Sequence, residues 1–367
     1  MSVDELPNRV SGVAKRTLHT ELDELAASLP VVAWGWTAAR AWTATRDRIA
    51  VARQHELSSD MEFTYRNPAR STEPARVLRS ARTVITVACE YGVEPTPAPS
   101  TRMGRIARYA ATDAYGHLRT ALGAIRTLIV EHGHRGVVVA DDNALVDREA
   151  AWRAGIGWYG HNSMLLVPGI GSWVVLGSVI TTAELGPCPK PPVKPSCGTC
   201  RRCQPACPTG AIGPDGSVDA NKCVSWLLQS SRPIPVELRG AIGDRIYGCD
   251  DCQVVCPPNR TRERQRPRQA VTPAVSPEWI DLVELLRCDD GELMHRVGDW
   301  YVARRDPQIV RRNAVVVLAN TADPYDAEVQ SELIAAAGSS HEMLSEHARW
   351  AVERFEARKL LTQPGST

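Results

Sequence analysis

Hydrophobic and polar positions follow two different periods along the first half of the chain. An apolar residue every three or four positions predicts amphipathic helices, and this spacing occurs at 14–29, 115–133 and 144–154. Short runs rich in β-branched residues predict buried strands, and these occupy 82–91, 136–140 and 172–182. Because helices and strands succeed one another, the pattern predicts an α/β (α+β) domain with its own hydrophobic core.

The second half divides into a cysteine-rich segment and a helical one. Five prolines interrupt the pattern at 184–198, which predicts a domain boundary, and the cysteine-rich segment runs to residue 258. Helical periodicity then returns at 279–297, 307–320, 327–338 and 341–358. Short helices in antiparallel pairs favour a small HEAT-like helical domain. We therefore expect three domains, at 1–187, 188–262 and 263–367.

Charge is balanced overall but uneven locally. The 367 residues carry a formal net charge of +1, which argues against a globally basic nucleic-acid binder. Arginine is nevertheless concentrated in two places, at Arg260, Arg262, Arg264, Arg266 and Arg268 around Glu263, and at Arg304, Arg305, Arg311 and Arg312. These arginines are either solvated surface groups or contacts to the phosphate backbone of a nucleic acid.

The start of the chain shows no targeting signal. Residues 1–16 include early acidic residues and no apolar central region, so they predict neither a secretory signal nor a twin-arginine leader. No run approaches the roughly 18 apolar residues that a membrane helix needs. We expect no membrane segment and a cytoplasmic protein.

Eight of the 11 cysteines lie within residues 197–256. The first four, Cys197, Cys200, Cys203 and Cys207, have the spacing C-x2-C-x2-C-x3-C-P of bacterial ferredoxins. In that spacing three thiolates bind one [4Fe-4S] cluster and the fourth binds a neighbouring cluster. The segment therefore predicts a second cluster.

The ligands of the second cluster follow downstream. Cys249, Cys252 and Cys256 form C-x2-C-x3-C-P, and Cys223 is the one cysteine of the segment that remains. Crossing the ligands as in two-cluster ferredoxins gives two complete sets. One set is Cys197, Cys200, Cys203 and Cys256, and the other is Cys207, Cys223, Cys249 and Cys252.

Zinc is the alternative, because C-x2-C pairs often hold this metal in tetrahedral sites. The additional C-x3-C-P ends and the supply of two sets of four thiols favour iron-sulfur clusters. Cys89, Cys188 and Cys288 are left over, and we interpret them as buried or incidental thiols.

Residues 155–160, "GIGWYG", match the pattern G-x-G-x-x-G without its usual context. A dinucleotide fingerprint follows a strand and opens a helix, whereas here a predicted helix precedes and extended chain follows. We expect the glycines to let the backbone approach a flat ligand or another strand closely. Just upstream, Asp141 and Asp142 follow the strand 136–140, and they are either helix N-caps or a carboxyl proton donor.

Several segments occur in an order that resembles the epoxyqueuosine reductase family. The similarity covers residues 60–355 and rests on "DDNALVDREAAWRAGIGWYGHNSMLL", "GSWVVLGSVITT", "SCGTCRRCQPACPTGAI" and "IGDRIYGCDDCQVVCPPN". The resemblance implies a cytoplasmic enzyme that uses cobalamin and two [4Fe-4S] clusters to reduce epoxyqueuosine at the wobble position of tRNA. It also implies an N-terminal corrinoid-binding domain like that of reductive dehalogenases.

The resemblance implies partners and site residues as well. The helical domain would help to hold tRNA at its anticodon loop region, and a low-potential donor such as flavodoxin or ferredoxin would supply electrons. No membrane partner is implied, and a monomer is the default expectation. Asp141 matches the family's proton donor, and the positions that match cobalamin contacts are Arg70, Asp141, Leu165, Leu176, Ser230 and Asp250.

The chain departs from the family pattern in three places. Where the family commonly has Gly-x-Asp-Tyr-His, this chain has "TDAYGH", so Ala114 and Gly116 take the acidic and histidine positions unless His117 substitutes. His161 replaces a lysine, and Pro258 replaces a tryptophan.

These departures leave three functions open at the level of sequence. The first is reduction of epoxyqueuosine. The second is a related reductase with the same cofactors and another substrate, of which a reductive dehalogenase is a narrower version disfavoured by the missing leader. The third is a ferredoxin-type electron carrier without its own catalysis.

Overall fold

The computed structural model describes residues 17–92, 96–188, 190, 192–265, 278–298 and 300–362. Its main sheet has the strand order β1-β2-β7-β4, and each neighbouring pair is antiparallel. The strands are β1 (Ala33–Ala38), β2 (Thr83–Glu90), β4 (Gly136–Ala140) and β7 (Val174–Thr181). Helices thus alternate with strands along the chain, although the sheet itself is antiparallel.

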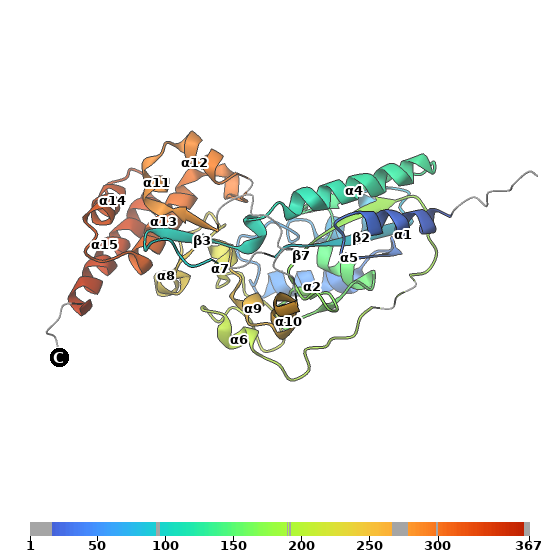
Figure 1. The fold of residues 1–367 in the computed structure, drawn as a ribbon, viewed down its shortest axis with the longest axis horizontal. Helices are drawn as coiled ribbons and strands as arrows, with labels where there is room; N and C mark the ends of the chain where they lie inside the picture. Colours follow the sequence, from blue (N-terminus) through green and yellow to red (C-terminus); the bar gives the residue numbers. More distant parts are fainter. Residues whose placement is uncertain are drawn as a thin grey trace, which may run out of the picture.

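Helices cover both faces of this sheet, which explains the continuous apolar run of β2. α1 (Leu18–Ser28) and α4 (Ala114–Glu131) pack on one face, where Ile85 and Val87 join the core (Figure 1). α5 (Asp147–Arg153) lies against the other face, where Ala88 packs with Ala151. A strand that is buried on both sides needs apolar residues at successive positions.

Shorter elements complete this part of the molecule. They are α2 (Thr43–Gln54), α3 (Pro68–Ser71), η1 (Pro74–Arg76), η2 (Arg108–Ala110), β5 (Trp158–Tyr159) and β6 (Leu165–Leu166). β5 lies within "GIGWYG" and pairs with β6, and a Cβ on Gly157 would lie 2.3 Å from the Leu166 carbonyl oxygen. Close approach to another strand therefore explains this glycine, and the order helix, turn, strand is not that of a dinucleotide site.

A second sheet takes one strand from each of the three predicted segments. Its order is β8-β3-β9, with β3 (Met103–Ile106) between β8 (Arg245–Tyr247) and β9 (Trp279–Asp281). The cysteine-rich segment also holds short helices: α6 (Cys203–Ala206), α7 (Val224–Leu227), α8 (Val236–Ile242), α9 (Asp251–Val254) and α10 (Pro257–Gln265). The second sheet thus ties the cysteine-rich segment to both of its neighbours.

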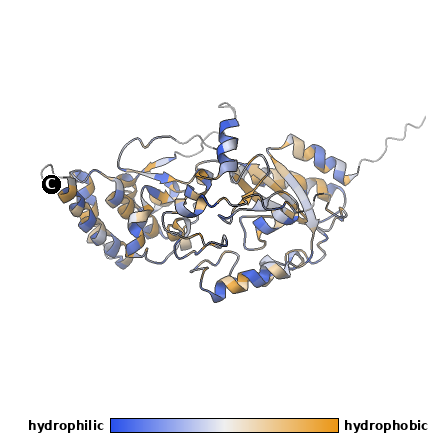
Figure 2. Cartoon of the chain, turned by 90° about the horizontal axis from the view of Figure 1, so that it is seen from below, coloured by the Kyte–Doolittle hydropathy of each residue, from blue (hydrophilic) through white to orange (hydrophobic). Residues whose placement is uncertain are grey.

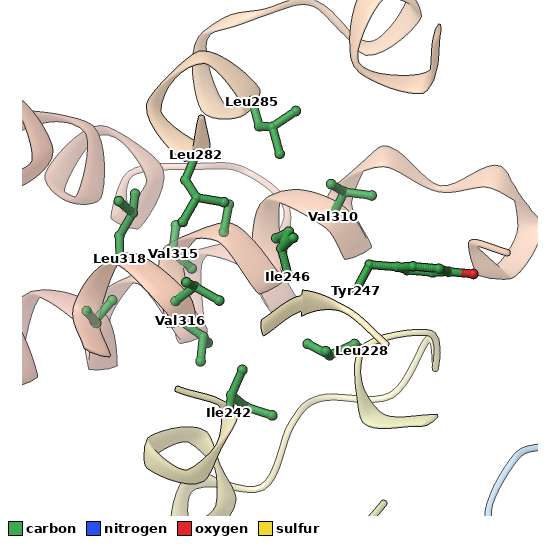
Figure 3. Close-up of a cluster of buried hydrophobic side chains, with 14 of the residues drawn as sticks. Leu228, Ile242, Ile246, Tyr247, Leu282, Leu285, Val310, Val315, Val316 and Leu318 are labelled. Atoms are coloured by element: carbon green, nitrogen blue, oxygen red, sulfur yellow. The ribbon is translucent and has the colours of Figure 1, made fainter. Parts of the chain in front are cut away.

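The end of the chain is helical and packs around one buried helix. Its elements are α11 (Leu282–Arg287), α12 (Asp290–Arg296), η4 (Ala303–Arg305), α13 (Pro307–Thr321), α14 (Ala327–Ala337) and α15 (Glu342–Thr362). The helices turn apolar faces inward and polar faces outward (Figure 2). α13 is the buried helix, and its Val315 and Val316 lie among Ile246 of β8 and Leu282 of α11 (Figure 3). The cysteine-rich segment and the helical end thus share one hydrophobic core.

Most predicted elements are present, but the helix predicted at 279–297 is wrong. Trp279–Asp281 pairs with β3 instead, and two separate helices follow. The side chains of Asp281 and Asp289 accept hydrogen bonds from backbone N–H groups of α11 and α12, so each begins a new helix. In the described part of the chain, no helix is both long and apolar enough to span a membrane.

Candidate functional site

The clustered cysteines lie near one another in the folded chain. Cys203 begins α6, and the backbone of Cys200 bonds to that of Cys197 at 3.0 Å. Cys256, two residues after α9, belongs to the same neighbourhood: burial, with smaller contributions from the Cys197, Cys203 and Cys200 thiols, raises its pKa to about 11. We call Cys197, Cys200, Cys203 and Cys256 the outer thiol set.

The other four cysteines come together deeper in the molecule. Burial raises the pKa of Cys223, and the nearby Cys207 thiol adds to the shift. Burial also raises the pKa of Cys249 to about 12, with a contribution from Cys223. Cys252 lies near both Cys249 and Cys223. We call Cys207, Cys223, Cys249 and Cys252 the inner thiol set.

The two sets adjoin each other. The thiol of Cys203, in the outer set, is close enough to raise the pKa of Cys252 in the inner set, after burial and its own neighbours. α6 and α9, which carry these cysteines, pack together (Figure 1). An electron that reaches one set therefore has a short path to the other.

The donor atoms suit iron-sulfur clusters better than a single metal ion. A lone zinc takes four ligands at about 2.0–2.3 Å from one point. A cubane places each iron at its own corner, so its four thiolates stay farther apart. All eight donors are also sulfur, which is the ligand type of such clusters.

Asp141 stands directly after strand β4. Its backbone has a φ of 51°, a left-handed conformation that aspartate adopts more readily than most residues. The following turn is held by the Asp142 carboxylate, which accepts from Ala144 N at 2.6 Å, and by Asn143, which accepts from Thr64 N at 2.7 Å. Helix α5 begins only at Asp147. The N-cap interpretation of Asp141 and Asp142 is therefore wrong.

The Asp141 carboxyl is accessible to solvent, yet its pKa is raised. Partial desolvation by the surrounding protein is the main cause, Asp142 adds to it, and Arg119 opposes it. A raised pKa keeps a larger share of this carboxyl protonated near neutral pH, as a proton donor requires.

A second carboxyl and two phenols lie with Asp141. Burial raises the pKa of Asp147 well above its usual range, and the Asp141 charge raises it further. Among the described residues, Asp147 Oδ1 is buried without a hydrogen-bond partner. Burial also raises the pKa of Tyr115, with contributions from Asp141, Asp147 and Tyr247. We call Asp141, Asp147, Tyr115 and Tyr247 the carboxyl–phenol group.

Tyr247 connects this group to the inner thiol set. Its phenol lies near Asp141 and forms a hydrogen bond with the Tyr109 side chain. It also accepts a hydrogen bond from Tyr301 N at 2.8 Å. Its ring stacks on Trp300 with centroids 4.4 Å apart. Cys249 follows Tyr247 by two residues. The inner set therefore borders the residues that can donate protons.

The residues predicted to contact cobalamin occupy several places. Leu165 is buried in the cluster against which Leu176 packs. Asp250, also buried, accepts from Arg108 N at 2.8 Å and lies near Tyr109. Ser230 Oγ donates to the Asp60 carboxylate at 2.8 Å. Arg70 is exposed on α3. The structure thus brings Leu165 and Leu176 together, and it records no contact of Arg70 with the other predicted residues in the described chain.

Two of the three departures from the family pattern have local structural contacts. Asp113 caps α4 by accepting from Gly116 N at 3.1 Å, and a Cβ on Gly116 would lie 2.1 Å from the same carboxylate oxygen. Ala114 is buried. His161 bonds to Arg201 at 2.8 Å. Asp113 and Gly116 therefore form a helix cap, which gives this motif a structural role.

Among the described residues, several arginines of the two concentrations are paired or buried. Arg262 pairs with Glu90 at 2.8 Å, while Arg260 and Arg264 are exposed; Arg266 and Arg268 lie outside the described residues. In the second concentration Arg312 is fully buried, so its interpretation as a surface group is wrong. Arg311 pairs with Asp290, Arg305 donates to the carbonyls of Gly298, Trp300 and Met294, and Arg304 is exposed.

Some residues of the site were missed by sequence reasoning. Asp147 and Tyr247 both lie in segments that resemble the family, but nothing in their spacing indicates a catalytic or binding role. The signal that identifies them is burial of an ionisable group beside another. Two cavities, of 460 Å³ between α1 and α4 and of 230 Å³ beside Trp34 and Trp36, are lined by other residues.

The chain is similar to several known proteins. Residues 196–259 match the model of a 4Fe-4S double cluster binding domain. The epoxyqueuosine reductase of Escherichia coli is 33% identical over 326 residues, which cover 83% of this chain and 81% of the relative. A solved epoxyqueuosine reductase with an epoxyqueuosine-modified tRNA-Tyr stem loop superposes with a TM-score of 0.79 at 27% identity, covering 95% of both chains. The Bacillus subtilis enzyme, solved with its aspartate-containing catalytic loop swung out of the active site, gives a TM-score of 0.80 at 27% identity and the same coverage.

Proposed function

The chain belongs to the epoxyqueuosine reductase family, and on this premise we propose that it reduces epoxyqueuosine to queuosine in tRNA. Removing an epoxide oxygen as water consumes two electrons and two protons. The observation that carries the proposal is that the source of protons lies next to the source of electrons. Tyr247 lies beside Asp141 and stands two residues before Cys249 of the inner thiol set. Two [4Fe-4S] clusters held by residues 196–259 supply the electrons.

The cluster ligands are assigned as the outer and inner thiol sets. The outer cluster is held by Cys197, Cys200, Cys203 and Cys256, and the inner cluster by Cys207, Cys223, Cys249 and Cys252. What supports this assignment is the proximity of the thiols within each set. The contact between Cys203 and Cys252 supports a relay from the outer cluster to the inner one.

The residues between the inner set and Asp141 fit a cobalamin. Asp147 Oδ1 has no partner in the described chain, so the site has free hydrogen-bonding capacity for a ligand rich in amides. When bound, cobalamin would supply low-valent cobalt, which attacks the epoxide or transfers electrons to it. Arg70, Asp141, Leu165, Leu176, Ser230 and Asp250 are the residues that would lie beside it.

Asp141 is the proposed proton donor to the epoxide oxygen. Its raised pKa and solvent-accessible position allow it to give up a proton and regain one. Its place in a turn after β4 also agrees with the mobile aspartate-containing loop of the Bacillus subtilis enzyme. Asp147 is more deeply buried, and this burial, together with the charge of Asp141, raises the pKa of Asp147 well above its usual range.

The tRNA is proposed to bind by its anticodon loop region, and the solved relative that holds an epoxyqueuosine-modified tRNA stem loop supports tRNA as the partner. Arg260 and Arg264 of α10 are exposed and available for phosphates. We assign three units, at 1–187, 188–262 and 263–367, with the last a short HEAT-like helical unit. The packing of α13 and α14 against α15 supports this assignment.

A second candidate is a related reductase with the same cofactors and another substrate. The observation in its favour is that Ala114 and Gly116 take the acidic and histidine positions of the family motif, and that Gly116 is part of the cap of α4. One assay separates the candidates: anaerobic reconstitution of the clusters, addition of cobalamin and a low-potential reductant, and measurement of queuosine in epoxyqueuosine-containing tRNA. Queuosine formation supports the first candidate, and corrinoid binding without queuosine supports the second.

A further inference from the structure

The loop that carries most of the outer thiol set is strongly basic. Residues 185–214 contain Lys190, Lys194, Arg201 and Arg202 and no aspartate or glutamate. The whole chain, by contrast, carries a net charge of only +1. Positive charge is therefore concentrated around one of the two clusters.

Two of these basic side chains are free to meet a partner. Lys194 and Arg202 are exposed, and the described residues include no hydrogen bond or ion pair to either side chain. Arg201 is occupied, since its Nη1 donates to the carbonyls of Gly198 and Cys200 and contacts His161. Lys194 precedes Cys197 by three residues, and Arg202 precedes Cys203 directly. Both charges thus stand next to cluster ligands.

The outer set is also the side of the relay that faces solvent. Gly198, Thr199 and Arg201, between its cysteines, are exposed. The inner set instead borders the carboxyl–phenol group through Tyr247 and Cys249. Electrons must therefore enter at the outer set and leave from the inner one. A donor protein has to approach close to residues 194–203.

We propose that residues 194–202 form the docking surface for a small acidic electron-transfer protein, with Lys194 and Arg202 as its charge contacts. This inference rests on the proposed function only in that the outer thiol set holds a cluster. Each encounter oxidises the donor by one electron and reduces the outer cluster by one electron. Two encounters supply the two electrons that one epoxide consumes.

Electrostatic docking suits this kind of partner. Electron-transfer encounters bury small areas, and opposite charges steer them at rates that fall steeply with ionic strength. Charge on the rim of such an interface changes the association rate more than the final affinity. Reversal of Lys194 and Arg202 should therefore slow the encounter at low salt.

The test measures cluster reduction by reduced flavodoxin in an anaerobic stopped-flow experiment, without cobalamin or tRNA. For Lys194→Glu/Arg202→Glu we expect the second-order rate constant to fall at least tenfold at low ionic strength and to approach the wild-type value at high salt. The matched control is Arg53→Glu/Arg349→Glu, which changes the net charge equally at exposed positions on α2 and α15. Its rate should stay within twofold of wild type.

Two further measurements keep the proposal open to refutation. Reduction by a small zwitterionic viologen should be unchanged, and an equal loss with this reagent would overturn docking by showing damage to the cluster. An unchanged rate of reduction of Lys194→Glu/Arg202→Glu by flavodoxin would also overturn the docking proposal. If this variant then lost affinity for tRNA, the loop would instead be an RNA-binding surface. Because the readout needs no epoxyqueuosine, failure here is distinct from failure of the proposed function.

Discussion

Replacement of Arg312 by methionine should strongly destabilise the cysteine-rich segment and the helical end together. Arg312 is fully buried on α13. Its guanidinium donates to the carbonyls of Ser230 at 2.9 Å, Arg232 at 2.5 Å and Leu227 at 2.8 Å. These carbonyls belong to the segment that carries Ser230, so one side chain holds that segment against α13.

The magnitude follows from the groups left without partners. A buried carbonyl that loses its donor costs about 1–3 kcal/mol, so three would cost roughly 3–9 kcal/mol. The substitution also removes a buried charge, whose desolvation costs several kcal/mol and lowers the pKa of Arg312. The net loss should therefore lie near the lower bound, at about 3 kcal/mol.

Thermal unfolding at matched iron content measures this loss. For a body of this size 1 kcal/mol corresponds to about 2–4 °C, so we expect Tm to fall by roughly 6–12 °C. Arg349→Met is the matched control, because Arg349 is exposed on α15 and its side chain bonds only to Ser345 Oγ among the described residues. A change in Tm of less than 2 °C for Arg312→Met would refute the reasoning.

Other variants probe the proposed chemistry and the ligand sets. Asp141→Asn should lower turnover by about 10²–10⁴-fold without loss of iron or tRNA binding, since it removes the proton donor; full turnover would exclude that role. Folding raises the pKa of Asp147, so the protonated carboxyl contributes to the stability of the folded state. This contribution is fully present below the unfolded pKa of about 3.9 and is lost as pH rises through the folded pKa. Asp147→Asn should therefore gain in Tm relative to wild type between pH 5 and pH 8, and a constant difference would contradict this. Cys256→Ser should lose the spectroscopic signal of one cluster, whereas Cys288→Ser should keep both, and loss of iron from Cys288→Ser would disprove the ligand assignment.

The double cluster domain shows how much residue spacing alone can predict. C-x2-C-x2-C-x3-C-P implies a partner cluster because the fourth cysteine turns away from the first three. That local geometry is encoded within a few residues, so it could be predicted without the fold. The strand ends of β4 and the start of α13 were predicted for the same reason, since short-range periodicity reports local structure.

Other features depend on residues that are distant in the sequence. The helix predicted at 279–297 is broken because Trp279–Asp281 pairs with β3, nearly 180 residues earlier. Arg312 looked like a surface charge, yet backbone carbonyls from residues 227–232 surround it. The partners of a side chain cannot be predicted from the residues next to it in the sequence when they belong to a distant segment.

The sequence by itself determined the family resemblance, the eight clustered thiols and the position of Asp141 after a strand, because each depends on residue type and short spacing. Only the tertiary structure decided that Asp147, Tyr115 and Tyr247 lie with Asp141 beside the inner set. It also decided which arginines stay exposed. The physical reason is that pKa shifts and ion pairs arise from burial and contact, and both are properties of the folded chain.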